Sequence, residues 1–294
     1  MKTIVIAGAS GFVGGHLSRH FESIGWKVKT IGRKRCDGTW DNPSSLVQVL
    51  EGADAVVNLA GKSVNCRFTK SNVEELVRSR VETTRAIGDA VVQCKTPPPV
   101  WINASGASIY REQVDEANTE KSATDGEGTM AEVARRWEEA FFGCSCANVR
   151  KVALRITLVL GDDGGVWPIY KRLARWGLGG RQGSGRQMMS WIHVDDLCRL
   201  VQHCATTPQV EGPVNAAAPG SVSNRDFMSA VLAAVGVKWG YPASAFEINM
   251  GTSILGIPGE LILRGMWVKN EQASIAGFSY SLPTLSDVIN AQTS

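Results

Sequence analysis

Residues 3–14 read TIVIAGASGFVG, and this stretch decides the fold class. The five residues from Thr3 to Ala7 are nearly all apolar and rich in β-branched side chains, which is typical of a strand buried on both faces. A glycine-rich turn follows, and from Phe12 apolar residues recur at helical spacing until Gly25. A strand, a glycine turn and a helix in this order predict the phosphate-binding start of a βαβ unit.

The three glycines of the turn each have a predicted steric role. Gly8 allows the tight turn, Gly11 lets backbone N–H groups approach a pyrophosphate, and Gly14 lets the helix pack close to the strand. The helix N-terminus adds partial positive charge, which favours phosphate. We therefore predict a dinucleotide site, and the residues expected to contact the ligand in this turn are Gly8, Ser10, Gly11, Phe12, Val13 and Gly14.

The second predicted strand, Lys27–Ile31, is followed by residues that indicate which dinucleotide binds. A site that prefers NAD needs Asp or Glu near the end of this strand to accept hydrogen bonds from the ribose. No carboxylate lies between Trp26 and Cys36, where the chain instead contains Gly32, Arg33, Lys34 and Arg35. Cations here can pair with a 2′-phosphate, so the sequence predicts NADP(H) held by Gly32, Arg33 and Lys34, with a solvated basic turn as the alternative.

Strands and helices alternate over the first 160 residues. Further strands are predicted at 53–60, 100–104 and 151–160, and helices at 44–50, 71–93 and 127–142. This alternation predicts an α/β fold, a Rossmann-type doubly wound parallel sheet, over residues 1–163. We expect 189–217 to return to that domain, and 164–188 with 218–294 to form a smaller α/β C-terminal cap domain, with helices over the later half at 194–206, 224–235, 252–263 and 282–290.

Composition excludes several other classes. The 294 residues have a net charge of only +3 and no long run of like charge, so no nucleic-acid partner is expected. The most apolar late stretch, 253–268, is interrupted by Pro258, Glu260 and Arg264, so no membrane span is expected. Seven scattered cysteines without a CxxC pair predict neither a disulfide framework nor a metal site. A motif that begins at Lys2 leaves no room for a leader, which predicts a cytoplasmic protein, and a homodimer is compatible with the sequence.

Several later segments carry a family resemblance. They are NLAG at 58–61, RVETT at 80–84, LRITLVLGDDGG at 154–165, SWIHVDD at 190–196 and GPVNAAAP at 212–219. With the glycine turn, they make the chain similar to the extended short-chain dehydrogenase/reductase superfamily, of the NAD-dependent epimerase/dehydratase type, and to an atypical subgroup with a small C-terminal domain of unknown function. The small residues at 58–61, Gly61 among them, are predicted to line the cofactor. The resemblance implies NADP contacts at Leu59, Ala60, Glu75, Arg80 and Val159.

The chain departs from this superfamily in its proton-transfer residues. The usual Tyr-x-x-x-Lys pair is absent, because the four tyrosines are followed four positions later by Val114, Ala174, Ala245 and Thr284. In the helix where the pair should lie, Arg135 or Arg136 could supply positive field but no protons. The remaining catalytic candidates are Ser105, in the motif NASG, and Tyr110.

Each candidate has a structural alternative. Ser105 could polarise a substrate oxygen or merely cap a strand, and an unassisted phenol such as Tyr110 is a poor acid at neutral pH. The candidate substrate contacts are Arg186, Trp191 and His193. For Arg186 the alternative is a solvated loop, and for Trp191 it is a place in the core. For His193 the alternative is the start of a helix capped by Asp195 or Asp196.

Two functional hypotheses remain open. The first is an NADP(H)-dependent oxidoreductase or epimerase-like enzyme that acts on a small carbonyl or sugar-like substrate. The second is a non-catalytic NADP(H)-binding sensor or regulator, for which a link to cell division is one interpretation.

Overall fold

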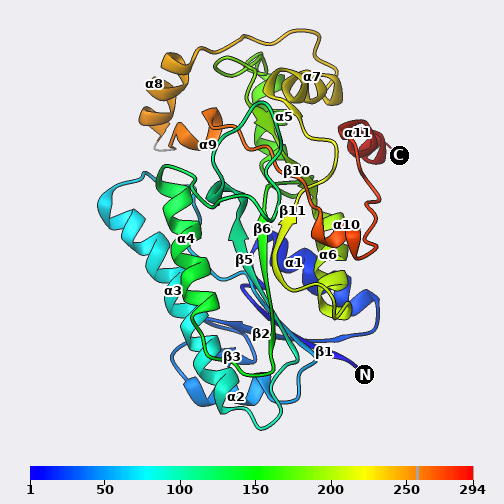
Figure 1. The fold of residues 1–294 in the computed structure, drawn as a ribbon. Helices are drawn as coiled ribbons and strands as arrows, with labels where there is room; N and C mark the ends of the chain where they lie inside the picture. Colours follow the sequence, from blue (N-terminus) through cyan, green and yellow to red (C-terminus); the bar gives the residue numbers. More distant parts are fainter. Residues whose placement is uncertain (256–257, 294) are drawn as a thin grey trace.

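The fold is built around one seven-stranded parallel sheet. The computed structural model describes residues 1–255 and 258–293 (Figure 1). The strands lie in the order β11–β6–β5–β4–β1–β2–β3. Their bounds are β1 Thr3–Ala7, β2 Lys27–Gly32, β3 Gly38–Thr39, β4 Ala55–Asn58, β5 Val100–Gly106, β6 Arg150–Ile156 and β11 Gly212–Ala216. The chain runs outward in both directions from β1, which confirms the predicted doubly wound α/β class.

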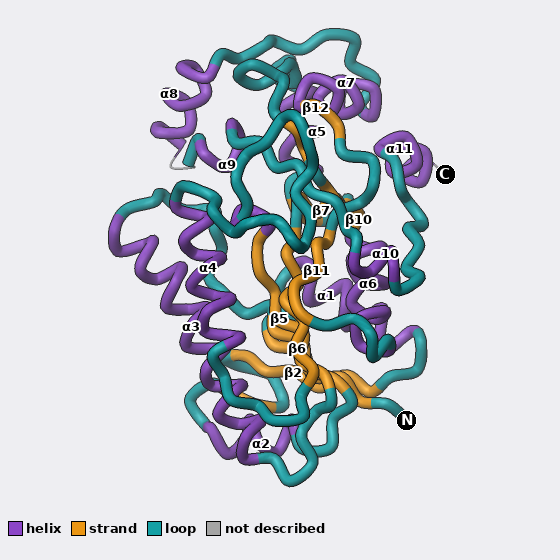
Figure 2. The backbone as a smooth tube through the Cα atoms, in the orientation of Figure 1, coloured by secondary structure: helices purple, strands orange, loops and turns teal. Residues whose placement is uncertain are grey.

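Helices cover both faces of this sheet (Figure 2). On one face lie α1 (Phe12–Ser23) and α6 (Val194–Thr206), and on the other lie α2 (Pro43–Leu50), α3 (Lys70–Gln93) and α4 (Thr129–Phe142). Side chains of β1 alternate between the two cores, with Ile4 and Ile6 in the first and Val5 and Ala7 in the second. A strand that is apolar at every position is therefore required here, because both of its faces are buried.

The later part of the chain forms a smaller layer with its own core. It contains α5 (Trp167–Arg175), α7 (Asn224–Ala234) and α11 (Leu285–Thr293), packed around buried Trp167, Trp191 and Phe227. Two small sheets accompany them, one of β7 (Leu158–Gly161), β8 (Gly164–Gly165) and β10 (Trp191–His193), the other of β9 (Met188–Met189) and β12 (Val222–Ser223).

Two sequence predictions of secondary structure are wrong in detail. The strand predicted over 151–160 breaks at Thr157 into β6 and β7, which belong to different sheets. The helix predicted over 252–263 is replaced by α8 (Ala245–Leu255) and α9 (Glu260–Leu263), and its residues 256–257 lie outside the described residues. The earlier start of α8 follows from a reciprocal cap, in which Ser244 N donates to Glu247 Oε2 at 2.7 Å and Glu247 N donates to Ser244 Oγ at 3.3 Å.

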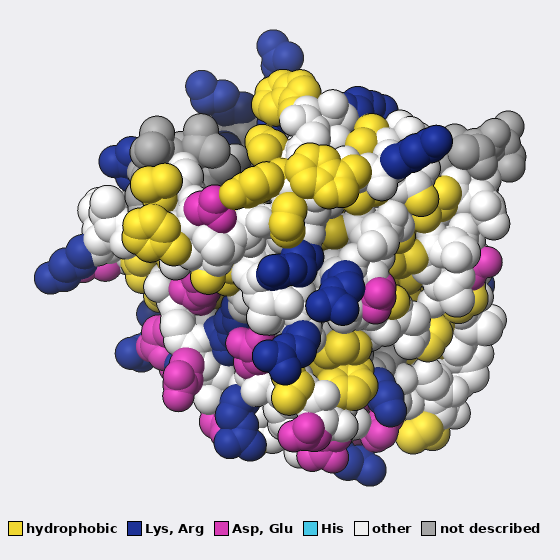
Figure 3. Space-filling view, turned by 90° about the horizontal axis from the view of Figure 1, so that it is seen from above, with side chains coloured by type: hydrophobic (Ala, Val, Ile, Leu, Met, Phe, Trp, Pro, Cys, Tyr) yellow, Lys and Arg dark blue, Asp and Glu magenta, His cyan; other side chains and the backbone are white. Residues whose placement is uncertain are grey.

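The surface of the smaller layer is unusual. Seen from above, large apolar side chains gather there among basic ones (Figure 3). None of the helices in the described ranges is both long enough and apolar enough to cross a bilayer.

Candidate dinucleotide-binding site

The glycine turn is sterically fixed by its neighbours. Gly8 has φ +85°, and a Cβ there would lie 2.9 Å from the carbonyl carbon of Leu59. A Cβ on Gly14 would lie 2.3 Å from the carbonyl oxygen of Gly8, so the helix approaches the strand too closely for any side chain. The backbone of Gly8 also donates to the carbonyl of Ile31 at 3.2 Å. Both positions therefore require glycine.

The N-terminus of α1 is open to a ligand. Its N-cap residue is Gly11, which provides no side-chain cap, so the first N–H groups of the helix lack the usual partner. Ser10 and Gly11 are exposed, while Phe12 and Val13 are half-buried. Free N–H groups combined with the positive end of the helix dipole fit the phosphates of a dinucleotide.

The basic turn after β2 offers unneutralised cations. Arg33, Lys34 and Arg35 are all exposed, and within the described ranges none of them forms an ion pair. The carboxylate that follows, Asp37, accepts hydrogen bonds from the backbone N–H of Thr30 at 2.7 Å and from its hydroxyl at 3.1 Å. The Asp37 carboxylate is therefore already hydrogen-bonded within its own loop. The turn consequently fits a 2′-phosphate better than a ribose without a phosphate.

The 58–61 segment is held in place by a buried polar network. Leu59 N donates to the carbonyl of Ala7 at 2.9 Å, and Ala60 N donates to Asn58 Oδ1 at 3.0 Å. The amide of Asn58 donates in turn to Thr84 Oγ1 at 3.1 Å and to Asn103 Oδ1 at 2.8 Å. These bonds fix the backbone of the segment next to the glycine turn, which suits the predicted cofactor wall.

Arg80 lies buried directly against this segment. A Cβ on Gly61 would be 3.0 Å from the Arg80 guanidinium carbon, and within the described residues Arg80 has no acidic partner. Burial lowers the pKa of Arg80 to about 10. A buried cation without a counter-ion fits an anionic ligand. Glu75, five residues earlier, is paired with Arg78 at 2.6 Å.

The segment after β6 closes over the first residue of α1. Cβ atoms on Gly161, Gly164 or Gly165 would lie within about 3.1 Å of the Phe12 ring. A Cβ on Gly165 would also lie 2.3 Å from the carbonyl oxygen of Val159. The glycines of this segment therefore let Val159 and Phe12 lie near one another, a requirement that the sequence analysis did not identify.

Ser105 lies near the carboxyl end of β5. It is only 4% exposed, and its hydroxyl has no hydrogen-bond partner in the described structure. An orphaned buried hydroxyl is costly, so it is a feature that requires a reason.

Helix α4 passes this site at Met130 and Ala134, two residues whose side chains carry no titratable group. Ser108, three residues after Ser105, donates to the carbonyl of Met130 at 3.1 Å, and a Cβ on Gly106 would lie 3.9 Å from that of Ala134. Met130 and Ala134 are four residues apart, which is the spacing of the missing Tyr-x-x-x-Lys pair. Arg135 and Arg136 point elsewhere, since both form ion pairs with Glu132.

Tyr110 is part of an internal network. Its hydroxyl accepts from Arg155 at 2.6 Å and donates to Asn215 at 2.9 Å, and Arg155 forms two 2.8 Å bonds with Glu138. Burial raises the pKa of Tyr110, and the neighbouring Arg155 opposes this shift only in part. A raised pKa and a fully bonded hydroxyl both oppose proton transfer at neutral pH. The partners lie far apart in sequence, so no local sequence pattern predicts this network.

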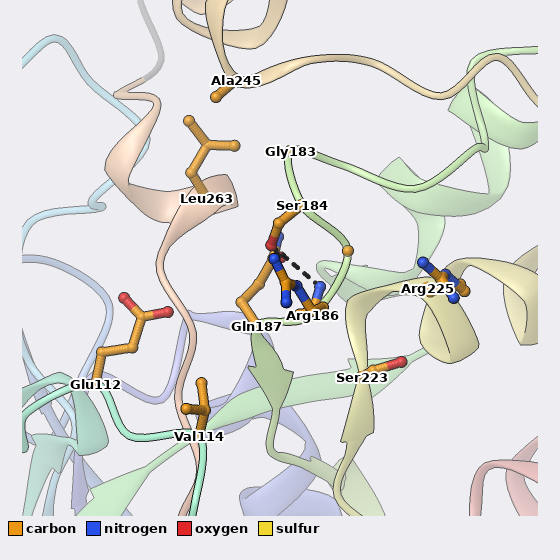
Figure 4. A pocket seen from close by; sticks show the side chains of 11 residues that line it. Glu112, Val114, Gly183, Ser184, Arg186, Gln187, Ser223, Arg225, Ala245 and Leu263 are labelled. Atoms are coloured by element: carbon orange, nitrogen blue, oxygen red, sulfur yellow. Dashed lines mark hydrogen bonds between the residues drawn. The ribbon is translucent and has the colours of Figure 1, made fainter.

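The three predicted substrate contacts lie in different surroundings. Arg186 is exposed and lines a cavity of about 610 Å³ together with Glu112, Ser223 and Arg225 (Figure 4). Trp191 is fully buried, and its indole donates to the carbonyl of Gly220 at 2.9 Å. The structure therefore uses this ring as core of the smaller layer.

His193 is the N-cap of α6. Its Nδ1 accepts from the backbone N–H of Asp195 at 3.3 Å, so the expected cap by Asp195 or Asp196 is wrong. The buried carboxylate of Asp196 instead accepts from the backbone N–H groups of Ser281 and Leu282 at 2.9 Å each. Burial lowers the pKa of His193.

A doubly wound parallel sheet with an open helix N-terminus behind its first strand defines a Rossmann-type nucleotide-binding protein. The sequence pattern of the NAD dependent epimerase/dehydratase family matches residues 4–217, and the chain belongs to this family, which confirms the resemblance.

Relatives of similar length match nearly the whole chain. The human epimerase family protein SDR39U1 is 29% identical over 288 residues, 96% of each chain, and the Bacillus subtilis epimerase family protein YfhF is 28% identical over 96% and 95%. The crystal structure of human SDR39U1 (isoform 2), determined with NADPH, has a TM-score of 0.89 with 28% identity over 98% of both chains.

Proposed function

We propose that this protein binds NADP(H) and uses it as an oxidoreductase or epimerase-like enzyme on a small carbonyl or sugar-like compound. The observation that carries the proposal is the uncapped N-terminus of α1, which lies behind a turn whose Gly8 and Gly14 tolerate no side chain. The unpaired cations Arg33 and Lys34 support NADP(H) over NAD(H). The NADPH in the human relative agrees with this choice.

Some residues of the chain would bind the cofactor, and another would orient the substrate. The N–H groups of Phe12 and Val13, the first residues of α1, would hold the pyrophosphate. Arg33 and Lys34 would hold the 2′-phosphate, and Arg80 would add positive field beside the 58–61 segment. When bound, the nicotinamide supplies or accepts a hydride. Ser105 would donate its unpartnered hydroxyl to a substrate oxygen, which orients the substrate and stabilises negative charge there.

A specific observation favours the second candidate, an NADP(H)-binding sensor or regulator without turnover. Helix α4 presents Met130 and Ala134 near the end of β5, and the hydroxyl of Tyr110 is bonded on both sides. No side chain in this group exchanges protons readily near neutral pH. A protein of this kind would report the NADPH level through a partner. A role in cell division is one interpretation of such a regulator.

Titration with reduced cofactors tests the binding proposal. Energy transfer from tryptophan to reduced nicotinamide reports binding directly, and we expect NADPH to bind at least about tenfold more tightly than NADH, which corresponds to about 1.4 kcal/mol. Equal affinity for the two cofactors would contradict the assignment of the cations after β2.

Turnover separates the two candidate functions. NADPH consumption is measured with a panel of aldehydes and of sugar nucleotides. Consumption with any of them supports the enzyme, whereas tight NADPH binding with a uniformly negative panel favours the regulator.

A further inference from the structure

The outer surface of the smaller layer carries an apolar face that nothing in the proposed function uses. Its members are large apolar side chains that stand far out of the protein. Their exposed fractions are 68% for Trp176, 50% for Leu178, 66% for Trp239, 44% for Tyr241, 75% for Phe246 and 54% for Met250. Isolated exposed apolar residues are ordinary, but an extended group of them marks an interaction surface.

Hydrogen bonds join the three segments that build this face. Tyr241 N donates to the carbonyl of Gly177 at 2.7 Å, which places the segment around Trp239 beside that of Trp176 and Leu178. The Tyr241 hydroxyl donates to Glu247 Oε1 at 2.7 Å, which ties the same segment to α8. On α8, Phe246 and Met250 are four residues apart and therefore share one side of the helix. Figure 3 shows yellow side chains close together across this surface.

Cations without counter-ions flank the apolar face. Residues 164–188 contain five Lys and Arg and no Asp or Glu. Arg172, Arg175 and Lys238 are exposed, and in the described part of the chain none of them forms an ion pair. The Arg172 guanidinium carbon lies 5.7 Å from the centroid of the Trp176 ring, so the charge directly borders the apolar face. The acid bonded to Tyr241, Glu247, also accepts two hydrogen bonds from Ser244.

The charge of this surface favours one kind of binding partner over another. A second copy of the chain, docked by two-fold symmetry, would present a face with the same excess of cations, so it does not offer them the opposite charge. An anionic bilayer fits both the apolar side chains and the cations that flank them. Trp and Tyr favour the level of the lipid headgroups, Phe, Leu and Met enter the acyl boundary, and Lys or Arg are attracted by anionic lipids.

We propose that the apolar face formed by Trp176, Leu178, Trp239, Tyr241, Phe246 and Met250 binds the surface of an anionic lipid bilayer. The protein lies on the membrane without crossing it. Arg172, Arg175 and Lys238 contact the headgroups, and the nucleotide-binding layer remains in water. This inference is independent of the proposed catalytic function, because it concerns neither the glycine turn nor Ser105.

Sedimentation of the full chain with lipid vesicles tests the inference. Vesicles of phosphatidylcholine with about one third phosphatidylglycerol are compared with vesicles of phosphatidylcholine alone. We expect binding to the anionic vesicles to be at least about tenfold stronger, and to weaken as salt screens the charges. The double variants Trp176→Ser/Trp239→Ser and Arg172→Glu/Arg175→Glu should each lose at least about tenfold in vesicle binding.

A matched control uses the other end of the molecule. Ile24, directly after α1, and Lys27, the first residue of β2, are both exposed, so Ile24→Ser/Lys27→Glu should bind vesicles like the wild type. All variants should retain wild-type NADPH affinity measured by calorimetry, which shows that they are folded.

Three results would overturn the inference. They are equal binding to neutral and anionic vesicles, unchanged binding of both double variants on the apolar face, and absence of vesicle binding. In the last case, a concentration-dependent dimer abolished by Trp176→Ser/Trp239→Ser would assign the face to a second copy. Capture on polyglutamate, abolished by Arg172→Glu/Arg175→Glu, would assign it to an acidic polypeptide.

Discussion

The guanidinium carbon of Arg80 lies 5.0 Å from the ring centroid of Trp137, so a buried cation of α3 rests on an indole of α4. The same indole donates its N–H to Thr84 Oγ1 at 3.0 Å, and Thr84 also accepts from Asn58. One tryptophan thus joins the cation below the 58–61 segment to the network that holds the segment itself. Cation–π contacts of this kind gain strength where water is excluded.

Trp137 is expected to separate stability from cofactor affinity. Trp137→Phe keeps an aromatic ring under Arg80 but removes the hydrogen bond to Thr84, which should lower the free energy of unfolding by about 1–3 kcal/mol and leave NADPH affinity nearly unchanged. Trp137→Ala removes the ring as well, so it should cost about 3–5 kcal/mol and weaken NADPH binding. Urea unfolding and calorimetry measure the two quantities. Full NADPH affinity in folded Trp137→Ala would show that Arg80 does not depend on the indole.

Two adjacent glycines of α1 provide a matched pair. Gly14→Ala would place a Cβ 2.3 Å from the carbonyl oxygen of Gly8, so we expect it to displace the turn and weaken NADPH binding by at least about tenfold. In Gly15→Ala the new Cβ would lie 3.7 Å from Arg19 Nη1, which is an ordinary contact. Because alanine favours helix, Gly15→Ala should unfold at higher urea, with a gain of up to about 1 kcal/mol. Equal behaviour of the two variants would contradict the close packing at Gly14.

Arg33 should discriminate between the two cofactors. Arg33→Ala removes a charge-assisted bond to the 2′-phosphate, so NADPH affinity should fall by about 1–3 kcal/mol while NADH affinity stays nearly the same. Titration by fluorescence energy transfer with each cofactor gives the ratio. Lys27→Ala serves as a control for loss of one exposed positive charge at the far end of β2, the strand that precedes Arg33. A parallel fall in NADH affinity would instead indicate a general effect on the turn.

Ser105 and Tyr110 should respond in opposite ways. The buried Ser105 hydroxyl has no hydrogen-bond partner among the residues that the structure describes, so Ser105→Ala should unfold at equal or higher urea. Turnover, where present, should fall by at least about tenfold. Tyr110→Phe removes the hydrogen bond from Arg155 and the one to Asn215 Oδ1, both of them buried, which should cost about 1–3 kcal/mol of stability. Per folded molecule, Tyr110→Phe should retain its turnover. A stable Tyr110→Phe variant without turnover would restore Tyr110 as the proton donor.

The stability of the protein should fall as the pH drops below the ordinary pKa of histidine. Burial lowers the pKa of His193 from 6.5, with Asp195, Asp196 and Asp162 opposing the shift and His16 adding to it. The unfolded chain therefore binds the proton more readily, so this contribution is complete above pH 6.5 and is lost as the pH falls through that range. Asparagine is also a good N-cap, so His193→Asn should keep α6 while reducing the loss of stability between neutral and mildly acid pH. Urea unfolding at both pH values measures the difference, and an unchanged difference would assign it to other groups.

The sequence predicted the elements whose cause is local. The strand at Thr3–Ala7, the glycine turn and α1 follow from burial, sterics and periodicity within about twenty residues, and all three are confirmed. The start of α8 also has a local cause, the Ser244–Glu247 cap, but the prediction overlooked it. The break at Thr157 was hidden because its immediate neighbours, Ile156 and Leu158, are both apolar and continue the strand pattern.

The chemistry around Ser105 was beyond sequence reasoning. The Tyr110 hydroxyl meets Asn215, which is 105 residues away, and Arg155, which is 45 residues away. Nothing in the spacing of these residues indicates that they form one network, because the contact depends on how β6, β11 and α4 pack. The absence of Tyr-x-x-x-Lys was visible in the sequence, whereas the presence of Met130 and Ala134 near the end of β5 was visible only in the fold.

The edge strand β11 pairs with β6 although more than fifty residues separate them in the chain. A chimera that joined the first 163 residues to a foreign partner would leave β6 as an unpaired edge strand. Such an edge can pair with strands of neighbouring molecules. Recombination can therefore exchange the outer layer of this protein only when the exchanged piece brings its own copy of 212–216, and successful hybrids should have their crossover points on both sides of that strand.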